Sequence, residues 1–388
     1  MRYVRRRIEG EIQRVARASA VLILAGPRGA GKTTLLRRLF PKAGYALLEE
    51  PAAIAKVRSD PGAFLDGLRT PAILDEAQNA PEVVGSIRAR LDGARVGKGP
   101  WILTASREGP LLGAVRESLG GRAALLHLLP LSVTETPKVT LLHGGLPDIL
   151  ARPARRDAWL SSHLAGQLER DLQGVASVRD PAVFRQFLGI VASRHGQLLN
   201  REELAAPLGL SLAAVAEWLG LLEETGRLLV VPPSQESFGK RPIHAPKIYV
   251  ADSGLACHLL GIGAERDLAG SPLAAPLFEG FVASEIVKAQ ANAGRPREIY
   301  HFRDQQGLKV DFLVPESGGV MALVDVKATR AVRPEDADPL LRLAGAVRGR
   351  PLRACLVHRG GSAKKKAETL RPGVKAFALP EFLDDLAP

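Results

Sequence analysis

The segment that most constrains this chain is the loop 26–33, which has the spacing G-x-x-x-x-G-K-T. It follows the apolar run Val21–Ala25 and leads into residues 34–40, so the order strand, loop, helix is predicted. Glycines let backbone N–H groups close on phosphates, while Lys32 and Thr33 suit phosphate oxygens and Mg²⁺. An ordinary glycine turn is the alternative, but the flanking pattern favours a phosphate-binding loop. The candidate nucleotide-binding residues of this loop are Gly26, Pro27, Arg28, Gly29, Ala30, Gly31, Lys32, Thr33 and Thr34.

A second apolar run, Ala72–Leu74, ends in the carboxylates Asp75 and Glu76. Downstream of a phosphate loop this is the Walker B pattern, in which Asp75 holds Mg²⁺ through water and Glu76 orients and deprotonates the attacking water. A strand that runs out into a polar turn is the alternative. Another buried strand, 101–106, is expected to bring Thr104 or Ser106 to the same sheet edge, where either would sense the γ-phosphate. These residues predict ATP and Mg²⁺ as the cofactors.

Arg122 follows two glycines, after a predicted helix over 111–119. A cation at this place suits an arginine finger that a neighbouring subunit supplies, which predicts a homo-oligomer and a catalytic group alongside Lys32 and Glu76. The alternative is a surface arginine in a salt bridge.

Four segments carry a family resemblance: GPRGAGKTTLL, AILDEAQ, WILTAS and GGR…LLPLSVTE. They resemble the bacterial and archaeal AAA-type ATPases that end in the DUF4143 domain of unknown function. Later segments extend the resemblance over almost the whole chain: 143–147, 169–171, 247–255 and 279–282. One departure is Ala105, where the family more usually has glycine. The resemblance implies an AAA-type parallel sheet and ATP hydrolysis.

Residues 158–233 are predicted to be mainly helical and to end in a winged helix. Asn200 and Ser211 are suitable caps for two short helices, and the strand 225–231 leads into a wing over 232–246. The second helix is acidic, with Glu217, Glu223 and Glu224, so a packing or oligomerisation role competes with DNA contact. The wing favours DNA contact through its basic residues Lys240, Arg241, His244 and Lys247.

The last third of the chain resembles the PD-(D/E)xK nucleases. A helix over 278–290 places Glu285 on its apolar face, and two strands, 308–314 and 320–327, carry Asp311, Asp325 and Lys327. Glu285, Asp311 and Asp325 are the candidate metal ligands, and Lys327 would help position the water. The alternative is a salt bridge between Asp325 and Lys327 in a domain that is kept as a binding platform. Further on, Lys364, Lys365 and Lys366 form a candidate DNA-binding patch or a solvated loop.

Composition and charge limit the number of domains and the kind of partner that we expect. The 388 residues suggest two or three domains, and the net charge of +12 favours DNA as a partner, although a GC-rich genome also raises arginine content. Two isolated cysteines and the absence of a long apolar run predict a cytoplasmic protein with no membrane segment.

We therefore expect an α/β protein of three domains. These are an AAA-type P-loop parallel-sheet domain (1–145), a helical and winged-helix domain (146–262) and a PD-(D/E)xK nuclease-like α/β domain (263–388). The expected function is an ATP-dependent motor or remodeller of duplex or branched DNA with a possible metal-dependent nuclease. The alternative is a nucleotide-gated switch whose C-terminal domain is an inactive binding platform.

Overall fold

The computed structural model describes residues 3–93, 99–171, 180–235, 242–347, 349–360 and 367–386. Its contacts divide the chain into two compact units. The N-terminal unit comprises Met1–Leu131 with Glu224–Gly226 and Ala291–Arg295, and the C-terminal unit comprises Ser132–Glu223, Arg227–Gln290 and Pro296–Pro388. The domain boundaries at 145/146 and 262/263 stay predictions.

A five-stranded parallel sheet forms the centre of the N-terminal unit, with the order β2-β3-β4-β1-β5. The strands are β1 (Val21–Ala25), β2 (Gly44–Leu47), β3 (Ala72–Asp75), β4 (Trp101–Ala105) and β5 (Ala123–His127). Because all five run the same way, their carboxyl ends meet at one edge, where ligands of such sheets bind. The predicted P-loop sheet is therefore confirmed.

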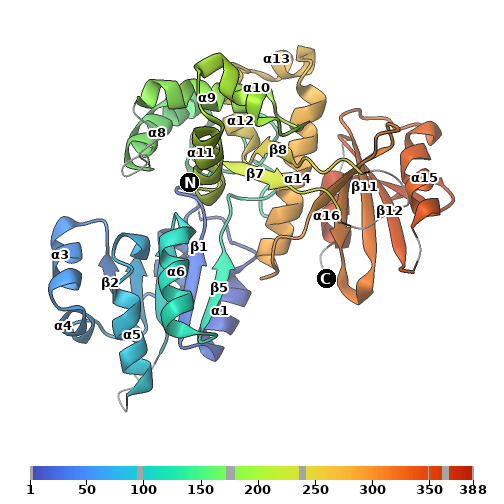
Figure 1. The fold of residues 1–388 in the computed structure, drawn as a ribbon. Coiled ribbons are helices and arrows are strands. Elements are labelled where there is room, and N and C mark those ends of the chain that lie inside the picture. The colour runs from blue at the N-terminus through green and yellow to red at the C-terminus, as the bar shows by residue number, and fades with distance from the viewer. Residues whose placement is uncertain are drawn as a thin grey trace. The chain divides into compact units, whose positions relative to one another are not determined.

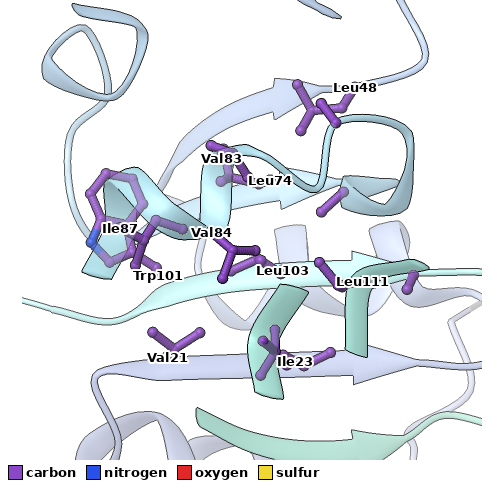
Figure 2. Close-up of a cluster of buried hydrophobic side chains, with 14 of the residues drawn as sticks. Val21, Ile23, Leu48, Leu74, Val83, Val84, Ile87, Trp101, Leu103 and Leu111 are labelled. Atoms are coloured by element: carbon purple, nitrogen blue, oxygen red, sulfur yellow. The ribbon is translucent and has the colours of Figure 1, made fainter. Parts of the chain in front are cut away.

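Helices cover both faces of this sheet, since side chains alternate along each strand. On β1, Leu22 and Leu24 pack against α1 (Glu9–Ala18) and α2 (Lys32–Leu39). Val21 and Ile23 belong to the opposite cluster, which Figure 2 shows. The helices on that side are α3 (Pro51–Ser59), α4 (Pro61–Asp66), α5 (Val83–Asp92) and α6 (Glu108–Leu119) (Figure 1).

The C-terminal unit begins with helices and a small antiparallel sheet. Its helices are α7 (Pro147–Ala151), α8 (Arg156–Asp171), α9 (Pro181–Ser193), α10 (Arg201–Ala205), α11 (Leu212–Glu224), α12 (Ser253–Leu259), α13 (Glu265–Gly270) and α14 (Ala274–Asn292). The sheet has the order β6-β8-β7, with β6 (Gln197–Leu198), β7 (Leu228–Val231) and β8 (Lys247–Val250).

The predicted caps of α10 and α11 are present. The side chain of Asn200 accepts hydrogen bonds from the backbone N–H groups of Glu202 and Glu203, and Ser211 Oγ accepts from Ala214 N at 3.1 Å. Gly209 turns the chain between the two helices with φ of 62°, a conformation that glycine adopts without a steric penalty. The order helix, turn, helix, strand is the one expected, and the antiparallel pairing of β8 with β7 adds to it.

The connection from β7 to β8 was expected to be a wing, and residues 236–241 of it lie outside the described part of the chain. Its two flanks pair with the segment around β9 (Tyr300–Arg303). Ser234 N donates to His301 O and Ile243 N donates to Arg303 O, each at 2.8 Å. Both flanks are therefore fixed to a strand of the next sheet.

That next sheet is mixed, with the order β13-β14-β12-β11-β10-β9. The strands after β9 are β10 (Lys309–Pro315), β11 (Met321–Lys327), β12 (Leu352–His358), β13 (Glu368–Arg371) and β14 (Val374–Ala378). β9, β10 and β11 pair antiparallel, whereas β11, β12 and β14 pair parallel. Leu340 and Leu343 of α15 (Asp338–Ala346) join the core on one face, and α16 (Leu379–Leu386) packs on β14 and β12.

Both cysteines lie inside the C-terminal unit. Burial raises the pKa of Cys257 to about 12 and that of Cys355 to about 11. Within the described residues, no helix by itself has both the length and the apolar composition to cross a bilayer. The bent pair Arg201–Leu208 and Leu212–Glu224 meets that test only when both are counted together, across a bend of 108°.

Candidate functional site

The phosphate loop lies between β1 and α2, as its motif requires. Gly26 N donates to Ala105 O of β4 at 3.1 Å, which fixes the start of the loop. Gly26 has φ of 147°, and a Cβ atom there would lie 2.1 Å from Leu128 O. Only glycine fits this position, because the side chain of any other residue would collide with backbone.

Lys32 and Thr33 stand at the N-terminus of α2. Lys32 Nζ donates to Gly26 O at 2.8 Å, and burial lowers the pKa of this lysine against the opposing effect of Glu76 and Asp75. Thr33 Oγ1 donates to Asp75 Oδ2 at 2.6 Å, and Tyr45 OH donates to the same oxygen at 2.8 Å. The hydroxyl and the carboxylate expected to bind Mg²⁺ thus meet directly.

Thr104 connects the side chain of Asp75 to the backbone of Glu76. Its hydroxyl donates to Asp75 Oδ1 and accepts from the backbone N–H of Glu76 at 2.9 Å. Its side chain is fully buried, and with these two partners it positions Asp75 and Glu76. Of the two candidate γ-phosphate sensors, Thr104 is therefore already engaged in this way.

Glu76 has a left-handed backbone, with φ of 58°, which is uncommon for a non-glycine residue and occurs at functional sites. Ser106 Oγ and Gln78 Nε2 both donate to its Oε2, the latter at 2.6 Å. The second sensor candidate, Ser106, therefore also contacts a carboxylate.

Arg28 joins the phosphate loop to this network. Its Nη2 lies 3.6 Å from Glu76 Oε2, and its Nη1 lies 2.6 Å from Glu49 Oε1. A general base must accept a proton through such an oxygen. Three donors thus contact Oε2, whereas the other oxygen, Oε1, lies 3.9 Å from Lys32 Nζ.

The other candidate residues of the loop differ in their exposure. Pro27 and Ala30 are buried, Gly31 has φ of 98°, and Gly29 and Thr34 are exposed.

Arg122 follows α6 and forms an ion pair with Asp92, an arrangement that matches the surface alternative. Its side chain is 53% exposed, and the finger role stays a prediction.

Sequence reasoning missed one residue that holds the loop. Arg6 is buried and donates from Nη1 to Ala30 O at 2.9 Å and from Nη2 to Leu129 O at 2.6 Å. It stands among other arginines, and nothing in the local pattern distinguishes it. Tyr45 and Gln78 were missed as well. Tyr45 contacts Asp75, which is distant in sequence, and Gln78 lies beyond the end of β3.

In the C-terminal unit, the predicted hairpin brings Asp311 and Asp325 together. β10 and β11 pair Phe312 with Val324, so Asp311 and Asp325, each one residue further along its strand from this pair, lie at adjacent positions across the two strands. Lys327 Nζ lies 2.8 Å from Asp325 Oδ2, as expected for residues two apart on a strand. Burial and the negative charge of Asp311 raise the pKa of Asp325 to about 7.

Two sequence assignments in this unit are wrong. Glu285 does not join the aspartates, because its buried carboxylate pairs with Lys288 Nζ at 2.8 Å and accepts from Val133 N at 2.8 Å. Lys247 is no wing cation for DNA, because it is buried and its Nζ lies 2.8 Å from Glu279 Oε1 and 3.3 Å from Asp311 Oδ1. The helical carboxylate of the cluster is Glu279, which stands in the segment 279–282 that carried the resemblance.

Of the remaining DNA-binding candidates, the structure describes only His244. Lys240, Arg241, Lys364, Lys365 and Lys366 lie outside the described residues, and His244 is exposed. On α11, Glu217 is exposed and Glu223 pairs with Arg297 at 2.8 Å. Among described residues, no group of three or more His, Cys, Asp or Glu side chains is arranged to hold a metal ion.

Three family matches cover the chain: an AAA domain over 18–136, the domain of unknown function DUF8612 over 135–266, and the domain of unknown function DUF4143 over 275–382. The uncharacterized proteins Rv2008c of Mycobacterium tuberculosis and Mb2031c of Mycobacterium bovis are each 31% identical over 321 residues, which span 81% of this chain and 72% of theirs.

Among solved structures, the Walker-type ATPase PABY2304 of Pyrococcus abyssi is similar with a TM-score of 0.47 and 16% identity, over 66% of this chain and 96% of that one. A signal transduction ATPase with numerous domains, PH0952 of Pyrococcus horikoshii, follows with a TM-score of 0.26 and 17% identity, over 74% of this chain and 47% of that one. The chain belongs to the same family as Rv2008c and Mb2031c, and it carries an AAA domain followed by a C-terminal DUF4143 domain.

Proposed function

We propose that the N-terminal unit binds ATP with Mg²⁺ at the phosphate loop and hydrolyses it, with Glu76 as the general base. The observation that carries this proposal is the 2.6 Å contact between Thr33 Oγ1 and Asp75 Oδ2 beside Lys32. A hydroxyl and a carboxylate are the oxygen ligands that Mg²⁺ takes in such sites, and the bound ion neutralises phosphate charge. Lys32 would exchange its bond to Gly26 O for phosphate oxygens.

We further propose that the nucleotide controls the base. Arg28 lies between two carboxylates, those of Glu49 and Glu76. A γ-phosphate at the loop offers this guanidinium a stronger anionic partner, because phosphate accepts two parallel hydrogen bonds from arginine. Movement of Arg28 to the phosphate would take a positive charge away from Glu76, which would make this carboxylate a better acceptor for the proton of water. Such coupling suits a nucleotide-gated switch.

DNA is the partner that we propose for this switch. The net charge of +12 supports a polyanion, since clustered lysine and arginine provide most of the affinity for nucleic acid. We propose that the C-terminal unit is the binding platform, and that Arg122 acts between subunits of a homo-oligomer. Translocation along DNA is the more specific form of the same proposal.

The test compares ATP turnover and DNA affinity in one set of proteins. A motor requires that duplex or branched DNA stimulate ATP hydrolysis, whereas a switch requires only that DNA affinity differ between ATP-bound and ADP-bound protein. Glu76→Gln, which would hold ATP without hydrolysing it, supplies the ATP state, and wild type with ADP supplies the other. If DNA leaves ATP turnover unchanged and the ATP-bound and ADP-bound proteins bind DNA equally well, DNA is not the partner.

Cleavage of DNA is the second candidate, and the order Asp311, Asp325, Lys327 favours it. Lys247 disfavours it, because its ammonium already pairs with two of the cluster's carboxylates. Supercoiled plasmid incubated with Mg²⁺ or Mn²⁺ distinguishes the two cases. Nicking that Asp325→Ala abolishes, with ATP hydrolysis intact, would establish a nuclease.

A further inference from the structure

Five side chains form a carboxylate cluster in the C-terminal unit. They come from β8, α14, β10 and β11, and are Lys247, Glu279, Asp311, Asp325 and Lys327. Four of them have little exposure, and Lys327 has a side chain 30% exposed. Tyr249 OH donates to Glu279 Oε1, which fixes the helical carboxylate in place.

The nuclease resemblance implies a divalent cation between these carboxylates, and the arrangement does not fit one. Lys247 Nζ bridges Glu279 Oε1 at 2.8 Å and Asp311 Oδ1 at 3.3 Å. The second oxygen of Asp311 accepts from Val326 N at 3.1 Å. A metal ligated by Asp311 would therefore compete with the ammonium at Oδ1 or with the Val326 N–H at Oδ2.

The carboxylates of the cluster already have two cations beside them. Three carboxylates, those of Glu279, Asp311 and Asp325, face the ammonium groups of Lys247 and Lys327 at distances of 2.8 to 3.3 Å. Adding a dication here would bring excess positive charge into a buried site, which is unfavourable.

We propose that Lys247 is the resident cation of the carboxylate cluster, and that the C-terminal unit completes this core without a divalent metal. The ammonium holds β8 to α14 and β10 through buried charge-assisted bonds, which are the stronger kind. The acidic residues that follow the nuclease-like order pack around the ammonium group of Lys247. A shorter, uncharged residue at 247 converts the cluster into a divalent-cation site, because it leaves carboxylates unpaired and opens space.

Mn²⁺ binding to the full chain without nucleotide tests this proposal. Electron paramagnetic resonance counts free Mn²⁺ in titrations of wild type, Lys247→Ala, Lys247→Arg, Asp311→Asn and the double variant Lys247→Ala/Asp311→Asn. The phosphate loop contributes equally to all five. Lys309→Ala is the matched control, because Lys309 is an exposed lysine of β10 only two residues from Asp311.

We expect Lys247→Ala to bind one more Mn²⁺ per chain than wild type, and Asp311→Asn to remove no Mn²⁺ from wild type. The double variant loses that ion, and Lys247→Arg and Lys309→Ala do not gain it. Thermal unfolding with Mn²⁺ or with chelator is the second readout. It shows a Mn²⁺-dependent rise in the melting temperature for Lys247→Ala alone, whether or not that variant folds in chelator.

Two results overturn the proposal. One is a Mn²⁺ ion in wild type that Asp311→Asn removes, which needs no change at Lys247. The other is a Lys247→Ala protein whose Mn²⁺ binding and melting temperature respond to Mn²⁺ no more than those of the double variant. Neither result bears on ATP hydrolysis at the phosphate loop, so the proposed function is judged separately.

Discussion

Thr33 Oγ1 lies 2.6 Å from Asp75 Oδ2, although the two residues are 42 positions apart in the chain. Thr33 lies in α2, which follows β1, and Asp75 is the last residue of β3. The strands β1 and β3 are not neighbours, since β4 lies between them. The contact forms because the strand ends of a parallel sheet share one edge and α2 begins at that edge. It ties the phosphate loop to the Walker B strand.

Lys32→Ala is expected to abolish ATP hydrolysis, and Glu76→Gln to stop hydrolysis while ATP still binds. Lys32 neutralises phosphates in the ground state as well as in the reaction, whereas Glu76 acts on water only during the reaction. Equilibrium binding of a fluorescent ATP analogue and a phosphate-release assay separate the two effects. Hydrolysis by Glu76→Gln at the wild-type rate would show that the base is another residue.

Arg122→Ala is expected to lower turnover about 10³-fold or more if the residue acts as a finger. Nucleotide affinity should change little, since the guanidinium would act on transition-state charge. Mixing Arg122→Ala with Glu76→Gln protein should restore part of the activity, because each supplies what the other lacks. Full activity of Arg122→Ala, or of a strict monomer, would leave the residue with its Asp92 pair only.

Gly26→Ala is expected to prevent nucleotide binding and to destabilise the N-terminal unit by roughly 1–3 kcal/mol. The added Cβ would lie 2.1 Å from Leu128 O at a φ of 147°, so the loop or β5 must move. Gly113→Ala is the control, because Gly113 lies within α6 and a Cβ there meets nothing within 4 Å. That change should stabilise by about 0.5–1 kcal/mol or be neutral. Similar melting temperatures for the two variants would contradict the steric argument.

His195 is expected to make the C-terminal unit sensitive to acid. Burial lowers the pKa of His195 to about 3 from its usual 6.5, and its Nδ1 accepts from Val250 N at 3.1 Å. The unfolded chain therefore binds a proton below pH 6.5 that the folded chain does not. From this group, the free energy of unfolding should fall by about 1.4 kcal/mol for each pH unit below 6.5.

His195→Gln keeps an acceptor for Val250 N but does not titrate. Urea unfolding of both proteins at pH 7.5, 6.5 and 5.5 gives the two pH slopes, and the variant should have the shallower one. His301, with a pKa lowered to about 4 mainly by burial, contributes in the same direction in both proteins. Equal slopes would mean that His195 is protonated in the folded state.

The sequence predicted the N-terminal sheet and its loop well, because each signal there is local. Val21–Ala25 is a short apolar run, and Gly26 to Thr33 follows it directly. Helical caps were equally readable at Asn200 and Ser211, where a side chain bonds to backbone two or three residues on. Long-range contacts were not readable. Arg6 reaches Ala30 and Leu129, and no spacing rule connects those positions.

The C-terminal errors have one physical cause. Glu285 lies on the apolar face of α14, where a carboxylate needs a partner. The sequence pattern predicts a metal ion shared with the aspartates of the hairpin. The structure supplies Lys288, one turn further along the same helix. Lys247 was interpreted as a surface charge because basic residues surround it in sequence. Burial of a lysine depends on which carboxylates surround it in the fold, and these come from α14 and β10.

The two buried thiols make this chain convenient for fluorescence. A dye maleimide reacts with an exposed thiolate, and Cys257 and Cys355 are both buried with raised pKa values. A cysteine introduced at exposed Lys42, and another at exposed Lys309, should therefore take donor and acceptor dyes without removal of the native cysteines. Energy transfer between the dyes would then report the distance between the two units in ATP and in ADP.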